Sequence, residues 1–461
     1  MTSWVPKLDR RNGPLYLAIV NTLAADVANG RLRVGDRIPT HRALAARLGI
    51  DFTTVSRAYA EARRRGLVVG YPGRGTFVRE LTSSRLQGGA RHLVDLSLNV
   101  PAEPPGDDST QEFARTLVAL SADIRLGSLL QYHENQGAPS HREAGSVWIT
   151  QRGLPTTPEC TALCAGAHHA ITSTLGALGA PGRVVLGEAL TFPGLKALAH
   201  FLGARLVGVP LDEHGLRPDA LAQACRAHQP VALCMVPTLQ NPTASVMPEE
   251  RRREIAGVAR EYGLAIIEDD TYGVLPAEAP PSVSSLAPEL SYYIATLSKC
   301  VTPGLRIAYV RAPDERAATR VADATRATMW MISPLLAEIA SRWIRDGTAG
   351  RIVQARRKEA AARHRVATRE LGSWLTRSHR HGYHAWLELP AGWLPSGFVN
   401  EARRRGVVVT PSEAFAVDAA FAEPGVRVCL GQAATTMELT AGLRVLAGIL
   451  DGAPDAGRAI L

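Results

Sequence analysis

Apolar and polar residues recur at helical spacing near the start of the chain. One face of an expected first helix carries the apolar side chains Leu15, Ile19, Val20, Leu23 and Val27. Gly30 follows this helix as a stop signal. A second, shorter helix is expected between Thr40, a suitable N-cap, and Gly49, a suitable terminator. Asp51 can cap a third helix that ends at Gly66. Two helices joined by such a short turn predict a helix-turn-helix unit.

Two apolar runs around a glycine-rich tip follow these helices, over residues 67–78, and predict a pair of strands. In helix-turn-helix units the second helix of the pair enters the major groove of DNA. The start of that helix supplies the candidate DNA contacts Thr53, Thr54, Ser56 and Arg57, because hydroxyls and guanidinium groups bind phosphates and base edges. Arg74, at the tip of the strand pair, suits a contact with the minor groove or the DNA backbone.

Charge is concentrated in this N-terminal segment. Residues 1–80 contain fourteen Lys and Arg but only six Asp and Glu, a net charge of +8, whereas the whole chain of 461 residues carries +9. A basic domain on a near-neutral body is typical of nucleic-acid binding, because cationic side chains release counterions from phosphates. The segment resembles the winged helix-turn-helix of the GntR family, through residues 35–39 and the run Gly73-Arg74-Gly75-Thr76. This resemblance places Arg42 at the DNA-contacting arginine of that family.

A later apolar run ends abruptly in acidic residues. It ends at Ile267 and is followed by Glu268, Asp269 and Asp270, the pattern of a buried strand with polar groups at its carboxyl end. Open α/β sheets bind ligands at such strand ends. A carboxylate there can keep the nitrogen of a pyridine ring protonated, and Asp269 is the candidate for this role. Tyr272 could donate a hydrogen bond to the phenolic oxygen of the same ring.

Lys299 lies in a sequence that suits a phosphorylated aldehyde. Lysine is the side chain that forms a Schiff base with a carbonyl group. The hydroxyl of Ser298 precedes it, and Arg306, whose planar guanidinium matches phosphate oxygens, follows it. Asn241, in a proline-bounded turn, offers another hydrogen-bond donor to the phenolic oxygen. This set of groups predicts pyridoxal 5'-phosphate as the cofactor.

The order and spacing of these groups resemble the fold-type I aminotransferases. The motifs are Asn241-Pro242, Asp269-x-x-Tyr272 and Ser298-Lys299-x-x-x-Pro303-Gly304-x-Arg306. The resemblance implies a phosphate loop at Gly166, Ala167 and His168, where the N–H groups of a helix N-terminus favour a phosphate. The loop departs from the family by carrying two histidines, His168 and His169.

The same resemblance assigns three further side chains. Phe192 is expected to stack on the cofactor ring, and Tyr132 to reach the phosphate bound by the partner subunit. Arg427 is expected to bind a substrate α-carboxylate through a bidentate pair. The resemblance therefore implies a head-to-tail homodimer.

Length and composition indicate a multidomain protein. We expect a winged helix-turn-helix domain over residues 8–80, a linker over 81–94 and an aminotransferase-like body over 95–461. The body should comprise a large α/β cofactor lobe, about 141–345, and a small α+β lobe, about 95–140 plus 346–461. Met1 begins no signal-peptide pattern, and the six cysteines form no CxxC pair, so we expect a cytoplasmic protein with reduced thiols and no membrane span. No metal-ligand spacing is present, and no metal is expected.

Over nearly its full length the chain resembles the MocR subfamily of GntR regulators, in which a winged helix is fused to an aminotransferase-like domain. The resemblance implies a transcriptional regulator that binds a double-stranded DNA operator with paired half-sites. In the leading hypothesis, Lys299 holds the cofactor as a Schiff base, and an amino acid or amine effector displaces it. A second hypothesis is an active pyridoxal-phosphate-dependent aminotransferase with an appended DNA-binding domain. A third is a sensor of pyridoxal phosphate itself, and the sequence leaves all three open.

Overall fold

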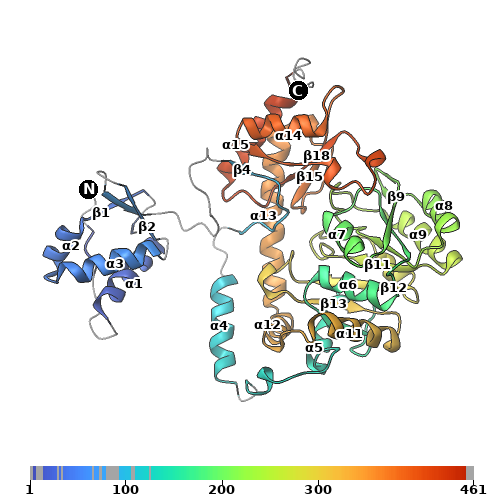
Figure 1. Cartoon of the computed structure of the whole chain (residues 1–461), viewed down its shortest axis with the longest axis horizontal. Helices are drawn as coiled ribbons and strands as arrows, with labels where there is room; N and C mark the ends of the chain where they lie inside the picture. The colour runs from blue at the N-terminus through green and yellow to red at the C-terminus, as the bar shows by residue number, and fades with distance from the viewer. Residues whose placement is uncertain are drawn as a thin grey trace. The chain divides into compact units, whose positions relative to one another are not determined.

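The chain folds into two compact units, one within residues 1–90 and the other within residues 91–461 (Figure 1). The computed structural model describes residues 4–6, 14–28, 31–32, 35–64, 67–71, 75–78, 93–104, 109–123 and 126–452. The linker predicted over 81–94 lies outside the described residues except for residues 93 and 94, and Val94 already belongs to a strand of the second unit. Among the described residues, no helix is both long and apolar enough to cross a membrane.

The first unit is a winged helix-turn-helix. Its helices are α1 (Leu15–Ala28), α2 (His41–Leu48) and α3 (Phe52–Arg64). Its antiparallel sheet has the order β1 (Arg37–Ile38), β3 (Gly75–Val78), β2 (Val68–Tyr71). The helices enclose a core that includes the buried side chains of Leu23, Val55 and Tyr59. The three helices and the strand pair expected from the apolar pattern are therefore confirmed.

Local capping groups set the helix boundaries in this unit. The Thr40 side chain accepts a hydrogen bond from the N–H of Ala43 at 3.3 Å, and Gly49 ends α2 with a φ of +62° that favours glycine. Asp51 Oδ1 accepts from the N–H of Thr53 at 2.7 Å, as expected for the cap of α3. The predicted stop signals Gly30 and Gly66 lie outside the described residues.

A seven-stranded sheet forms the centre of the second unit, in the order β5-β13-β12-β11-β10-β6-β7. The strands are β5 (Thr161–Cys164), β6 (Val184–Glu188), β7 (Arg205–Val209), β10 (Ala232–Met235), β11 (Ala265–Asp269), β12 (Ser291–Thr296) and β13 (Ala308–Arg311). Only β13 runs antiparallel to its two neighbours. Along β12, Tyr293 packs into one apolar cluster and its neighbours Tyr292 and Ile294 into another, because helices cover both faces of the sheet.

Two helices of the second unit precede the first strand of this sheet in the chain, and the others follow or separate its strands. They are α4 (Ser109–Ser121), α5 (Pro139–Thr150), α6 (Ala167–Ala177), α7 (Pro193–Phe201), α8 (Pro218–His228), α9 (Glu249–Tyr262), α10 (Val283–Leu286), α11 (Glu315–Met329) and α12 (Pro334–Arg345). The long helix α13 (Thr348–Leu371) then runs from the sheet to the smaller, C-terminal part of the unit (Figure 1).

The C-terminal part has a core of its own. Its antiparallel sheet has the order β14 (Arg377–Ser378), β15 (His384–Glu388), β18 (Gly425–Cys429), β17 (Thr410–Pro411). Two helices, α14 (Pro395–Arg404) and α15 (Thr436–Leu450), complete it. The chain that enters the unit joins this part, because β4 (Val94–Asp95) pairs in parallel with β16 (Val407–Val408). The unit is therefore an α/β body with a large lobe and a smaller α+β lobe, as predicted.

Candidate functional site

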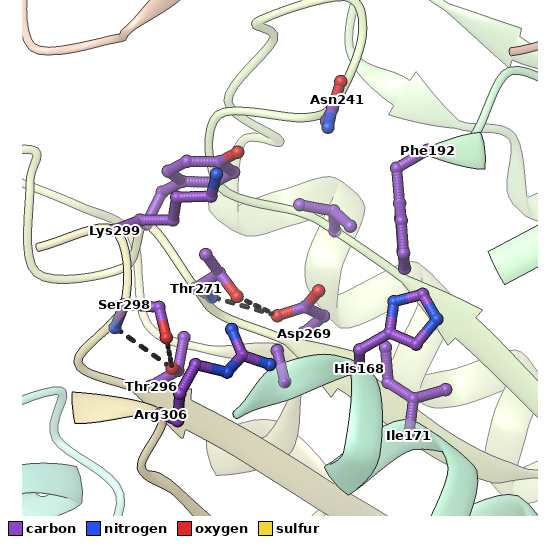
Figure 2. A pocket seen from close by; sticks show the side chains of 13 residues that line it. His168, Ile171, Phe192, Asn241, Asp269, Thr271, Thr296, Ser298, Lys299 and Arg306 are labelled. Carbon is purple, nitrogen blue, oxygen red and sulfur yellow. Dashed lines mark hydrogen bonds between the residues drawn. The ribbon is translucent and has the colours of Figure 1, made fainter. Parts of the chain in front are cut away.

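A cavity of about 260 Å³ lies at the carboxyl ends of the central strands (Figure 2). Its walls include the last residues of β11 and β12 and the residue that follows β10. Nine residues predicted to hold the cofactor line it: Ala167, His168, Phe192, Asn241, Asp269, Tyr272, Ser298, Lys299 and Arg306. Gly166 immediately precedes this set in the chain, whereas Tyr132 is not among the lining residues. Segments far apart in sequence thus meet in one cavity.

Lys299 follows β12 and turns its amine into this cavity. Burial lowers the pKa of the Lys299 ammonium, which favours the neutral, nucleophilic form of the amine. Its Nζ donates a hydrogen bond to the main-chain oxygen of Asn99. The neighbouring Ser298 is held in place by Thr296, whose Oγ1 lies 3.1 Å from the Ser298 hydroxyl. The residue before the lysine is thus held in place, and the lysine amine is chemically suited to attack a carbonyl.

Asp269 ends β11 at the centre of the cavity. Figure 2 shows its carboxyl between Lys299 on one side and His168 and Phe192 on the other. Burial raises the pKa of this carboxyl to about 6. Its Oδ1 accepts from the hydroxyl of Thr271 and, at 3.2 Å, from the N–H of Thr271, and these bonds favour the ionised form. Thr271, which also lines the cavity, was not predicted, although its place two residues after Asp269 in the sequence was a signal for this role.

The opposite end of the cavity is built for an anion. Gly166 makes the turn from β5 into α6 with a φ of +86°, and a Cβ on it would lie 2.9 Å from Arg306 Nη2. Arg306 Nη2 donates to the main-chain oxygen of Ala165 at 3.1 Å, which holds the guanidinium beside the turn. The first N–H groups of α6 have no partner within the helix. Together these donors form a cradle for a phosphate.

The two histidines of this turn have different positions. His169 Nδ1 accepts from the N–H of Ala165 at 3.1 Å, and its Nε2 lies 2.8 Å from the hydroxyl of Thr328 on α11, so this ring ties the turn to a neighbouring helix. His168 instead lines the cavity beside Phe192 (Figure 2). Burial and the nearby Arg306 lower the pKa of His168, which keeps its ring neutral at physiological pH.

Arg427 projects from β18 beside the cavity and is buried. Its Nη1 donates to Asn241 Oδ1 at 2.7 Å, and its Nη2 donates to the main-chain oxygen of Ser97 at 2.6 Å. The guanidinium also stacks on Phe415, at 4.7 Å from the ring centre. Arg427 Nε has no hydrogen-bond partner among the described residues. The predicted carboxylate-binding arginine thus lies next to Asn241.

Asn99 and His384 extend the site beyond the predicted residues. Asn99 Nδ2 lies 2.9 Å from Tyr272 Oη and 3.0 Å from His384 Nδ1. The sequence offered no motif for either residue.

Tyr132 lies on an exposed apolar surface of the second unit. Its side chain is 79% exposed and forms an edge-to-face contact with Trp330, itself 55% exposed, at 6.3 Å between ring centres. Leu130 and Met329 are also exposed beside them in the chain. The structure therefore places Tyr132 away from the cavity of its own chain.

The predicted DNA contacts gather at the start of α3 and on α2. Arg42, Thr53 and Arg57 are exposed, and Thr54 and Ser56 are half-buried. The Arg57 guanidinium lies over the ring of Tyr16, 4.5 Å from its centre. One face of this guanidinium is therefore already in contact with a side chain of the same unit. Arg74 lies outside the described residues.

His41, which precedes Arg42, packs its ring edge-on against Tyr59, with 4.6 Å between the ring centres. This contact packs the first residue of α2 against α3. No cluster of His, Cys, Asp and Glu side chains within the described part of the chain is arranged to hold a metal ion.

Comparisons with known proteins match both units. Residues 91–446 match the family of aminotransferases class I and II, and residues 15–78 match the bacterial regulatory proteins of the gntR family. The chain is 29% identical over 453 residues to the HTH-type transcriptional regulator YdeF of Bacillus subtilis, with 97% of each chain covered.

Two further matches concern the second unit. The chain is 28% identical over 341 residues to 2-aminoadipate transaminase of Thermus thermophilus. The match covers 72% of this chain and 81% of that protein. The solved structure of an archaeal alanine:glyoxylate aminotransferase matches with a TM-score of 0.69 and 24% identity, covering 78% of this chain and 91% of that one.

Proposed function

The chain belongs to the family of aminotransferases class I and II and carries a DNA-binding domain of the gntR family, and from this premise we propose that it senses an amino acid or amine at a lysine-bound cofactor. The architecture is that of a MocR-type transcriptional regulator, and the aminotransferase fold implies pyridoxal 5'-phosphate as the cofactor. The proposal concerns the effector and its site: Lys299 is the point of covalent attachment, and the effector binds beside it.

The residues in the cavity fit this cofactor. Gly166 supports the fit, because any larger residue would collide with Arg306 and close the anion cradle at the start of α6. Asp269, at the opposite end of the cavity, also supports the fit. A positive charge beside a buried carboxyl strongly stabilises its ionised form, and a protonated ring nitrogen would bring such a charge. When bound, pyridoxal 5'-phosphate supplies an aldehyde that a lysine amine captures and a ring that withdraws electrons from the captured amine.

Each residue has a separate task in this proposal. Arg306, Ser298 and the first turn of α6 bind the phosphate group. Phe192 stacks on the ring, Asp269 holds a proton at the ring nitrogen, and Asn241 and Tyr272 donate to the phenolic oxygen. Arg427 binds the α-carboxylate of an amino acid effector. One observation carries the proposal: a lysine amine of lowered pKa, a buried carboxyl and an anion cradle line the same cavity.

Covalent attachment can be tested at the level of single lysines, because the chain contains only four, at positions 7, 196, 299 and 358. Protein reconstituted with pyridoxal phosphate should show the absorbance band of a lysine-linked cofactor, and borohydride reduction should leave a pyridoxyl mass on Lys299. Lys299→Ala should lose both signals, and the exposed Lys358→Ala should keep both. A band that survives in Lys299→Ala would refute the assignment.

The effector is tested by adding a panel of amino acids and amines to the same protein. A change in the absorbance band without release of a 2-oxo acid, together with a change in operator affinity, supports regulation by an effector. The absence of any spectral response to the panel, with operator affinity that depends on the cofactor alone, supports a sensor of pyridoxal phosphate.

An active aminotransferase is the second candidate function. The similarity to 2-aminoadipate transaminase favours it, and so does the presence of Arg427 and Asn241 beside Lys299. In this function Lys299 also moves a proton to and from the substrate carbon. Rapid conversion of the cofactor to its amine form, with stoichiometric 2-oxo acid, would establish it.

A homodimer is supported by the exposed surface of Leu130, Tyr132, Met329 and Trp330. Apolar side chains gathered on a surface are typical of an interface. We expect Tyr132 to reach the cofactor phosphate of the partner subunit and the dimer to bind paired DNA half-sites. Sedimentation analysis should give a dimer for the native chain, and Tyr132→Asp combined with Trp330→Asp should give a monomer. Dimers that persist in the double variant would place the interface elsewhere.

A further inference from the structure

Asn99 is a buried junction between three parts of the second unit. It follows β4 in the chain, and only 9% of its surface is exposed. Its side chain contacts Tyr272, which lines the cavity, and His384, which begins β15 of the small lobe. His384 in turn contacts the main-chain oxygen of Gln240, the residue that precedes Asn241 in the large lobe.

The proton positions in this series of contacts follow from the last contact, between His384 and Gln240. His384 Nε2 lies 2.8 Å from the oxygen of Gln240, and a carbonyl oxygen can only accept, so Nε2 carries the hydrogen. Burial lowers the pKa of His384 to about 3, so the ring is neutral and its Nδ1 is an acceptor.

This histidine tautomer fixes the orientation of the Asn99 amide. The group 3.0 Å from His384 Nδ1 must be the NH₂ end, because the oxygen end would place two acceptors face to face. The second hydrogen of the same NH₂ group then points to Tyr272 Oη, 2.9 Å away. Tyr272 therefore accepts from Asn99.

A tyrosine hydroxyl that accepts from one neighbour keeps its own hydrogen for another partner. Burial raises the pKa of Tyr272, so the phenol keeps this hydrogen at neutral pH. The residue lines the cavity, where the phenolic oxygen of the cofactor is the acceptor that the proposed function places beside it. His384, acting through Asn99, therefore sets the direction of the hydrogen bond between Tyr272 and the phenolic oxygen.

We propose that Asn99, with its orientation fixed by His384, is a positioning residue that makes Tyr272 a hydrogen-bond donor toward the phenolic oxygen of the cofactor. This inference rests on the proposed function, because it concerns the same cavity and the same cofactor. It adds two residues, one from the segment after β4 and one from the small lobe, to the groups that set the electronic state of the cofactor.

The predicted effect is a change in a protonation equilibrium. A donor to the phenolate oxygen stabilises the anion, so the linkage between lysine and cofactor loses its proton at a lower pH when the donor is present. Loss of one hydrogen bond of ordinary strength corresponds to a rise of about 0.5 to 1 pKa unit, about three- to tenfold in the equilibrium. Asn99→Leu and His384→Phe should each raise the pH midpoint of the absorbance change of the bound cofactor.

A double-mutant cycle separates this role from a merely structural one. Tyr272→Phe removes the donor itself, so it should raise the midpoint at least as much as Asn99→Leu. In the Tyr272→Phe background, Asn99→Leu should add nothing, because no hydroxyl remains to be oriented. Leu98→Ala is the matched control, because Leu98 lies in the same segment with an exposed side chain, and its midpoint should equal that of the native protein.

Failure of this inference differs from failure of the proposed function. If the native protein shows no lysine-linked band, the proposed function is wrong. If the native band is present, an unchanged midpoint in Asn99→Leu overturns the inference, and so does an equal rise with and without the Tyr272 hydroxyl. His384→Phe gives the same test if Asn99→Leu does not fold, because loss of the Nδ1 acceptor lets the amide turn its oxygen toward Tyr272.

Discussion

Glu188 is a buried acid that the structure holds in its neutral form, and its replacement by glutamine should change how stability depends on pH. The residue ends β6 and is 1% exposed. Its Oε2 accepts from Gln240 Nε2 at 3.1 Å, and its Oε1 has no hydrogen-bond partner among the described residues. Burial raises its pKa from an ordinary 4.5 to about 8, and the nearby Asp269 adds to the rise.

The sign and size of the effect follow from this pKa. Below pH 4.5 the carboxyl is protonated in both the folded and the unfolded chain, so it contributes no pH dependence. Between pH 4.5 and about 8 the unfolded chain has lost this proton and the folded chain has kept it, so stability falls as pH rises. The slope is about 1.4 kcal/mol per pH unit, and the whole window corresponds to roughly 5 kcal/mol.

Glu188→Gln keeps the size of the side chain and the acceptor for Gln240 but removes this titration. From pH 5.5 to pH 7.5 the variant should therefore gain about 3 kcal/mol of unfolding free energy relative to the native chain. Urea unfolding followed by tryptophan fluorescence at several pH values measures the difference. Glu250→Gln on the exposed face of α9 is the control for the loss of one charge. Parallel pH profiles for Glu188→Gln and the native chain would show that Glu188 is ionised in the fold and would refute the reasoning.

Three further changes test other parts of the molecule. Gly166→Ala should weaken cofactor binding at least tenfold in an absorbance titration, because the new Cβ would collide with Arg306; Gly153→Ala, with a φ of +72° and no atom within 4 Å, controls for backbone strain alone. Thr40→Ala should destabilise the first unit by about 1 kcal/mol in thermal unfolding, because the cap of α2 is lost, whereas Thr40→Ser should keep it. Arg42→Ala should lower operator affinity and reduce its salt dependence by about one phosphate contact without changing cofactor absorbance; an unchanged mobility shift would contradict its assignment.

The fold was predictable where its signals are local. Thr40 and Asp51 cap helices within three residues of themselves, so the sequence alone places α2 and α3. The buried strand β11 was recognisable because its apolar run is followed directly by acidic residues, one of which, Asp269, lines the cavity. The smaller lobe was placed only through a family resemblance, because its strand pairing between β4 and β16 joins the two ends of the second unit.

The site was predictable where chemistry and spacing coincide along the chain. Lys299, Asp269 and Arg306 belong to short motifs, and the structure brings them into one cavity. Asn99 escaped prediction because its partners Tyr272 and His384 are 173 and 285 residues away, and no local pattern encodes such contacts. The contact of Arg57 with Tyr16 was equally hidden, because amphipathic spacing shows which face of a helix is apolar but not which neighbour covers its polar face.

Regulation by an effector requires that the effector bind two states of the protein with different affinity. Arg427 is where such a difference can arise, because its guanidinium is divided between Asn241 in the large lobe and the oxygen of Ser97 in the segment after β4. A carboxylate that takes hydrogen bonds from Arg427 competes with both of these acceptors. The segment that carries Ser97 is covalently continuous, through residues 79–92, with the DNA-binding unit. In the proposed function the guanidinium that binds the carboxylate of the effector is also the group that holds Ser97, so binding of an effector would change a contact made by the segment after β4.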